Sequence, residues 1–132
     1  SGNPKGKNPS DVWDIPNVKA HHVEKTCHPC QFPVALPQRL IKALSPSDGL
    51  VLDPFMGVGS TGVASILESR RFVGSEIVKE YYDIAYSRVF DALNGAAVVR
   101  DDKPVQSPSR GSAVAKLPEE FRIVRSQNDG KK

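Results

Sequence analysis

The sequence has few cysteines and no long apolar segment. Cys27 and Cys30 are the only cysteines among 132 residues. A secreted domain held by disulfides has more, so we expect a reducing, cytoplasmic location. No apolar run approaches the roughly 20 residues that span a bilayer, so no membrane partner is expected. Hydrophobic residues make up 39% and charged residues 25% of the chain, which is typical of a folded globular protein.

The chain also lacks a strong excess of charge of one sign. Its net charge is +3. Residues 1–94 contain ten basic and ten acidic side chains, whereas residues 95–132 contain eight basic and five acidic ones. The excess therefore lies near one end, and charge alone is weak support for a polyanionic partner.

Apolar periodicity and turn residues predict alternating helices and strands. Residues 11–15 alternate apolar and polar side chains before Pro16, which suggests a short strand or an extended segment. The stripe formed by Tyr82, Ala85, Val89 and Leu93 indicates the buried face of a long helix. Helix, strand, helix, strand and helix are expected in turn at residues 36–44, 50–53, 61–69, 71–76 and 79–93.

This order predicts an α/β fold that is half of a doubly wound sheet. The apolar Leu50–Leu52 segment is typical of a parallel strand covered on both faces. Two strands do not make such a sheet, so a partner or a missing segment must complete it. We expect an N-terminal arm over 1–24, an α/β half-domain over 25–94 and a flexible tail over 95–132, with a short ordered piece at 121–124.

A glycine-rich loop joins the first expected strand to the next helix. Gly57 and Gly59 allow a sharp turn, and Ser60 and Thr61 are suitable caps for the helix. Glu76 ends the following strand, 19 residues after Gly57, where nucleotide-binding α/β folds place an acid for ribose hydroxyls. This pattern predicts a nucleotide-type ligand at the loop.

Three ligand classes compete for this loop. A phosphate-binding P-loop needs Gly-Lys-Ser/Thr, and no lysine follows Gly59. A dinucleotide site formally fits Gly57, Gly59 and Gly62. However, Asp53 at the end of the strand suits a cation better than a pyrophosphate. S-adenosylmethionine (AdoMet, also abbreviated SAM) carries an ammonium and a sulfonium and no phosphate, so it fits best.

The segment Asp53-Pro-Phe-x-Gly-x-Gly-Ser-Thr61 resembles motif I of the DNA amino-methyltransferases. These enzymes methylate N6 of adenine or N4 of cytosine in DNA. His28-Pro29 and the helix to Leu44 resemble motif X of the family, and residues 70–88 resemble its motif II region. The resemblance covers residues 6–93 and implies a Rossmann-like methyltransferase fold with AdoMet as cofactor and DNA as partner.

The resemblance also assigns residues to the cofactor. The methionine end of AdoMet would be lined by the motif I residues, and Glu76 would hold the ribose. The His28 loop, with Lys25 and Phe32 as further members, would close over the amino-acid part. The implied cofactor-binding residues are His28, Pro29, Asp53, Pro54, Phe55, Gly57, Gly59, Ser60, Thr61 and Glu76.

One family feature is missing from the sequence. The family's catalytic motif is Asp/Asn/Ser-Pro-Pro followed by an aromatic residue, which binds the flipped target base. The chain has no Pro-Pro pair, so no catalytic residue is assigned and methyl transfer by the chain alone is not expected. It resembles the C-terminal, cofactor-binding half of the subgroup in which the catalytic motif comes first. A second chain or segment would then supply catalysis and target recognition.

Two other interpretations stay open. The alternative function is a non-catalytic module that binds AdoMet or assembles as a homo-oligomer. Cys27 and Cys30 lie close to His21 and His22, which suggests zinc. However, a structural zinc site draws its ligands from two separated pairs, so no metal is assigned.

Overall fold

The computed structural model describes residues 12–100 of the chain. Three helices and two strands alternate along it: α1 (Ala35–Leu44), β1 (Leu50–Asp53), α2 (Ser60–Leu67), β2 (Arg71–Gly74) and α3 (Lys79–Leu93). This is the α/β order predicted from the sequence. The expected short piece at 121–124 lies outside the described residues.

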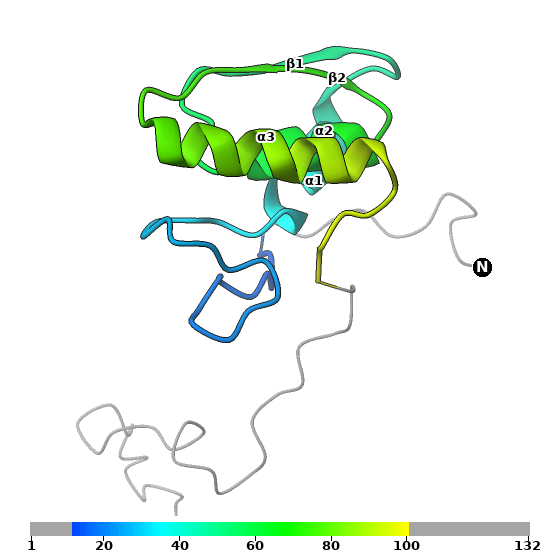
Figure 1. Ribbon diagram of the computed structural model, residues 1–132. Coiled ribbons are helices and arrows are strands. Elements are labelled where there is room, and N and C mark those ends of the chain that lie inside the picture. The colour runs from blue at the N-terminus through cyan, green and yellow to red at the C-terminus, as the bar shows by residue number, and fades with distance from the viewer. Residues whose placement is uncertain (1–11, 101–132) are drawn as a thin grey trace, which may run out of the picture.

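The two strands pair in parallel, with Leu50 opposite Arg71 and Asp53 opposite Gly74. Both strands therefore end at the same edge of the sheet, where Ser75 N donates to Asp53 O at 3.1 Å. In Figure 1 the helices lie on one side of the sheet, with α2 and α3 beneath the strands. The fold is a partial Rossmann-like unit whose carboxyl edge carries the glycine loop.

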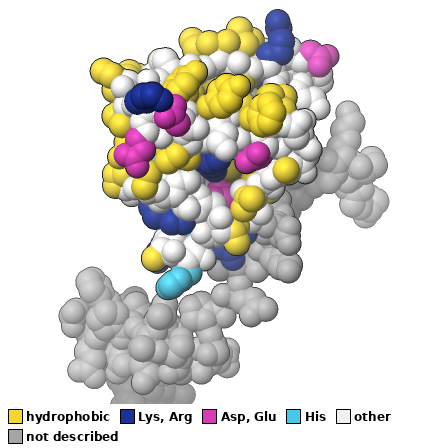
Figure 2. Space-filling view, in the orientation of Figure 1, with side chains coloured by type: hydrophobic (Ala, Val, Ile, Leu, Met, Phe, Trp, Pro, Cys, Tyr) yellow, Lys and Arg dark blue, Asp and Glu magenta, His cyan; other side chains and the backbone are white. Residues whose placement is uncertain are grey.

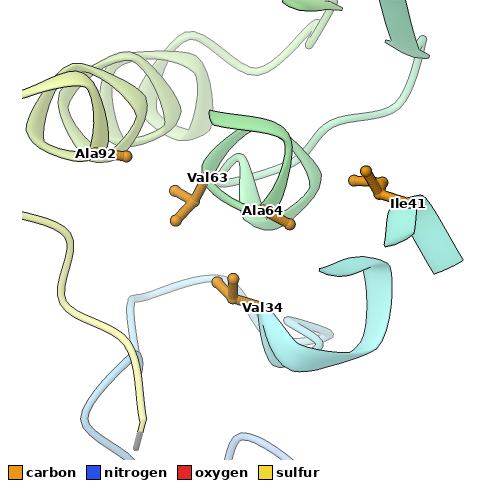
Figure 3. Close-up of a cluster of buried hydrophobic side chains, with 5 residues drawn as sticks. All are labelled: Val34, Ile41, Val63, Ala64 and Ala92. Carbon is orange, nitrogen blue, oxygen red and sulfur yellow. The ribbon is translucent and has the colours of Figure 1, made fainter. Parts of the chain in front are cut away.

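The core lies between the helices rather than under the whole sheet. Val63 and Ala64 of α2 pack with Val34 and Ile41 from the α1 side and with Ala92 of α3 (Figure 3). Val34 is only 1% exposed and Ala64 is fully buried. The small residues of α2 let the neighbouring helices approach it closely. This core fixes α2, and therefore the loop in front of it.

The outer face of the sheet is open within the described chain. Exposure alternates along both strands, and Leu50, Leu52 and Val73 are more than half exposed. The expectation of two covered faces is therefore wrong for residues 12–100, because all three helices lie on the other side (Figure 1). Such apolar side chains favour contact with another protein segment.

The buried stripe of α3 differs from the predicted one. Ala85 and Ala92 are buried, whereas Tyr82 and Leu93 of the predicted stripe are exposed. Because α2 packs on α3 through small residues, the larger side chains lie on the outside. They line an apolar groove of about 380 Å³ beside β2, and Figure 2 shows hydrophobic side chains gathered over this part of the surface. The predicted stripe is therefore only partly covered within the described chain.

Two further features concern the ends of the described chain. Residues 12–15 form no strand; Trp13 instead stacks on Arg39, with the guanidinium carbon 4.6 Å from the ring centroid. Ala97 and Val99, placed in the expected tail, pack against the core. None of the helices within residues 12–100 is long and apolar enough to cross a membrane.

Candidate cofactor site

The glycine loop between β1 and α2 is closed by its own backbone hydrogen bonds. Gly59 N donates to Met56 O at 2.8 Å, and Met56 N donates to Ser75 O at 3.0 Å. Gly57 and Gly59 both adopt positive φ angles, 52° and 78°, which only glycine takes without strain. The loop is thereby tied to the segment that follows β2 as well as to β1.

The residue that precedes α2 is Gly59, which has no side chain that could cap the helix. The expectation that Ser60 and Thr61 cap this helix is wrong, because the N-cap is Gly59 and no side chain forms a cap hydrogen bond there. Ser60 is buried, and its Oγ instead donates to Phe32 O at 2.9 Å. The first turn of α2 thus keeps backbone N–H groups that no side chain caps, and such groups attract electron-rich ligand atoms.

Glu76 lies directly against the glycine loop. Its Oε2 accepts a hydrogen bond from Gly57 N at 3.0 Å, and its Oε1 accepts one from Val78 N at 2.9 Å. Each carboxylate oxygen has two lone pairs, so each retains one for another donor. The acid is therefore held in place by the backbone and still has acceptors for a pair of hydroxyl groups.

Asp53 ends β1 on the other side of the loop. Its Oδ1 accepts a hydrogen bond from Phe55 N at 3.1 Å, which fixes the carboxylate beside the strand end. The neighbouring Pro54 and Phe55 are exposed, and the Phe55 side chain is 89% accessible. Asp53, Thr61 and Phe32 line one apolar groove of about 340 Å³ beside α1 and β1.

The loop around His28 folds over Gly57. A Cβ atom added to Gly57 would lie 3.3 Å from His28 Nε2, so the imidazole occupies the space in front of this glycine. His28 Nδ1 accepts a hydrogen bond from Cys30 N at 3.2 Å, and its ring meets the Tyr81 ring edge-on at 4.6 Å. The structure thus brings His28, Gly57 and Glu76 together, whereas Pro29 is exposed.

Glu24 and Gln31, which the sequence pattern did not single out, hold this loop from inside. The Gln31 amide donates to Glu24 O at 2.6 Å and accepts from Thr26 N at 3.0 Å. The Glu24 carboxylate accepts from Val34 N at 2.8 Å and from Arg100 N at 3.1 Å. Both side chains are buried. A polar residue flanked by loop residues gives no periodic signal, so only the fold shows these contacts.

The cysteine pair shows no sign of a metal or redox site. Within residues 12–100, no group of three or more His, Cys, Asp or Glu side chains is placed to hold a metal ion. Cys27 Sγ donates to Glu80 Oε1 at 3.4 Å. Local desolvation and then the hydrogen bond and charge of Glu80 raise the pKa of the Cys27 thiol, which disfavours the reactive thiolate.

These features of the loop and the strands identify the class of fold to which the chain belongs. A parallel strand, a glycine loop that enters a helix, and an acid two residues after the next strand form the nucleotide-binding half of a Rossmann-like fold. Residues 1–87 match the DNA methylase family model N6_N4_Mtase. The chain belongs to this family, as the resemblance of its motifs implied.

Curated relatives agree with this assignment. The type II methyltransferase M.ScaI of Streptomyces caespitosus is 52% identical over 91 residues, which are 66% of this chain and 30% of that protein. M.BglII of Bacillus subtilis is 46% identical over 86 residues, 65% of this chain and 24% of the relative. The DNA adenine methyltransferase YhdJ of Escherichia coli is 42% identical over 83 residues, 63% and 28% of the two chains. The chain thus spans less than a third of these relatives.

A solved structure has the same fold. M1.HpyAVI in its complex with SAM matches 67% of this chain and 42% of its own chain, with a TM-score of 0.52 and 33% sequence identity. The match extends the family assignment to the three-dimensional arrangement of the described elements.

Proposed function

We propose that this chain is the AdoMet-binding part of a DNA methyltransferase that acts on the exocyclic amine of adenine (N6) or cytosine (N4). The observation that carries the proposal is the convergence of His28, Gly57 and Glu76 at the carboxyl edge of the sheet. Family membership and the relatives that methylate DNA support it. The residues present fit AdoMet, because carboxylates flank the loop on both sides.

Each carboxylate has a distinct role in this proposal. Asp53, at the end of β1, faces the positive methionine end of the cofactor, and Glu76 accepts hydrogen bonds from the ribose hydroxyls. Gly57 and Gly59 let the backbone approach the ligand, with the N–H groups of Ser60 and Thr61 behind them. Pro54, Phe55, Pro29 and the His28 ring complete the walls.

When bound, AdoMet supplies an electrophilic methyl group on a sulfonium. In direct transfer the amine nitrogen of the base forms the new N–C bond while the C–S bond breaks, and the amine loses a proton. No covalent enzyme intermediate is needed, so no cysteine nucleophile is required. This chain contributes binding and orientation, and the remaining segment contributes base binding and target recognition.

The open apolar surfaces support a completing segment. The groove beside α1 and β1 contains Leu36, Leu40 and Leu52 next to the Asp53 carboxylate, at the free edge of the two-stranded sheet. A segment carrying the Pro-Pro-aromatic motif would there extend the sheet and place its base-binding residues beside the cofactor. Whether it belongs to the same polypeptide or a second chain is decided by what is encoded upstream.

The first experiment is calorimetric titration of the chain with AdoMet and with NAD. Saturable binding of AdoMet and no binding of NAD is expected, and the reverse would replace the proposal with a dinucleotide site. The second is transfer of labelled methyl groups to DNA by the chain mixed with an upstream segment of the family. Methylation by the mixture and not by either part supports the divided enzyme, whereas AdoMet binding without methylation favours the alternative, a non-catalytic binding or assembly module.

A further inference from the structure

Ser60 is the meeting point of three segments. Its hydroxyl donates to Phe32 O at 2.9 Å and accepts from Arg88 Nη1 at 3.4 Å. Ser60 is 3% exposed and is the first residue of α2. The loop that carries His28, the glycine loop and α3 are therefore joined through one buried hydroxyl.

Arg88 makes a second, shorter contact with the glycine loop. Its Nη1 donates to Val58 O at 2.5 Å. Because the peptide group is planar and trans, fixing the Val58 carbonyl also fixes the direction of the Gly59 N–H group. Arg88 thus acts on the turn between the two positive-φ glycines, from a helix 28 or more residues further along the chain.

The contact of Arg88 with the glycine loop follows from its position on α3. Arg88 lies three residues after Ala85 and four before Ala92, the two buried residues of the helix, so its stem follows the buried face. Ala85 itself packs on Gly59, where an added Cβ would lie 3.0 Å from Ala85 Cα. Burial lowers the pKa of Arg88, and the charge of Glu24 opposes this shift. Arg88 is thus a partly buried cation with a carboxylate near it and two acceptors on the loop. Burying such a charge costs more free energy than burying an apolar residue.

We propose that Arg88 is a positioning residue of the cofactor loop. By holding the Val58 carbonyl and the Ser60 hydroxyl, it keeps the Gly57–Gly59 turn and the first turn of α2 in the geometry that binds AdoMet. The contact of Ser60 with Phe32 passes this constraint to the loop that carries His28. The inference rests on the proposed function for its ligand, but the effect on the loop itself is measurable without any ligand.

The test compares Arg88→Met and Arg88→Lys with Arg39→Met. Methionine keeps an apolar stem and removes all donors, and lysine keeps a charged donor nitrogen but not the planar fork. Arg39 is the matched control, because it is also half-buried but stacks on Trp13, away from the loop. All measurements are made at a temperature at which circular dichroism shows each variant to be folded.

The first readout is amide hydrogen exchange at Gly59, taken relative to Ile41 in the core helix α1. Exchange at Ile41 reports any loss of global stability, so that a local effect on the loop is seen as a change at Gly59 that Ile41 does not share. Arg88→Met is expected to raise the ratio of the two exchange rates about tenfold, the effect of losing roughly one hydrogen bond to a charged group, with Arg88→Lys in between and Arg39→Met unchanged. An unchanged ratio in Arg88→Met would overturn the proposal and leave Arg88 a packing residue.

The second readout is AdoMet affinity by calorimetry. Arg88→Met is expected to weaken binding about tenfold, by the same loss, and Arg88→Lys to recover part of it. Wild-type affinity in Arg88→Met would overturn the cofactor-positioning role. A wild-type chain that binds no AdoMet contradicts the proposed function instead, while the exchange ratio still decides whether Arg88 positions the loop.

Discussion

Replacing Gly59 by alanine tests the packing of the glycine loop on α3. Gly59 has a φ angle of 78°, and a Cβ atom there would lie 3.0 Å from both Cα and Cβ of Ala85. Two costs combine: alanine in the left-handed region costs about 1 kcal/mol, and inserting a methyl group into a packed contact costs about 1–3 kcal/mol. We therefore expect Gly59→Ala to lower the free energy of unfolding by about 2–4 kcal/mol in total.

Gly95 provides a matched control. Its φ angle is 73°, close to that of Gly59, but nothing lies within 4 Å of the position of its Cβ. Gly95→Ala therefore carries only the conformational cost, about 1 kcal/mol. Urea unfolding of the two variants isolates the packing contribution as their difference, which should be about 1–3 kcal/mol.

A double-mutant cycle with Ala85→Gly locates this contribution. Removing the Ala85 methyl relieves one of the two 3.0 Å contacts and leaves the one with its Cα, so the double variant should recover part of the loss and not all of it. If Gly59→Ala and Gly95→Ala differ by less than about 0.5 kcal/mol, the error expected of additive comparisons, then the loop does not pack on α3 as described.

Three further predictions concern charge, thiol reactivity and the open sheet face. Burial raises the pKa of Glu68, but hydrogen bonds from Gln38 and Lys42 outweigh it and hold the pKa below its ordinary value of 4.5. The stability that this carboxylate contributes is present above pH 4.5 and is lost as pH falls through the lowered pKa. Urea unfolding should therefore show Glu68→Gln to be about 1 kcal/mol less stable than the wild type at pH 7, and this difference should disappear in acid. A difference that does not change with pH would refute the prediction. Because Glu80 raises the pKa of Cys27, Glu80→Gln should speed alkylation of Cys27 at pH 8 without affecting Cys30, as followed by mass spectrometry. Leu52 is 68% exposed, so Leu52→Gln should change the free energy of unfolding by no more than about 0.5 kcal/mol. The variant should nevertheless bind an upstream segment more weakly. Equal binding of the variant and the wild type in a pull-down would show that the segment docks elsewhere.

The regular elements could be predicted because their signals are local. The helix at 79–93 and the strand at 50–53 have the predicted bounds, and the first helix begins at Ala35, one residue before Leu36. Apolar patterns, together with a glycine or proline near most of the ends, mark these segments without reference to the rest of the fold.

The misjudged features depend on contacts between distant residues. Ser60 has the right side chain to cap a helix, but its hydroxyl bonds to Phe32, 28 residues earlier. Tyr82 and Ala85 lie on one predicted stripe, yet only the alanine fits against Gly59. Arg88 has a recognisable signal in retrospect, since it lies on the same face of α3 as Ala85 and Ala92. The partners of such residues are set by packing, which periodicity does not report.

Calorimetric titration with AdoMet of the wild-type chain, Glu76→Ala and Asp83→Ala tests the central claim most directly. Glu76 bonds to Gly57 N in the loop, whereas Asp83 lies on the exposed side of α3 in an ion pair with Lys79. The account predicts saturable binding by the wild type and Asp83→Ala, and binding at least about tenfold weaker for Glu76→Ala, as expected when buried hydrogen-bond partners are lost. Equal affinities in all three chains would contradict a cofactor site at the glycine loop.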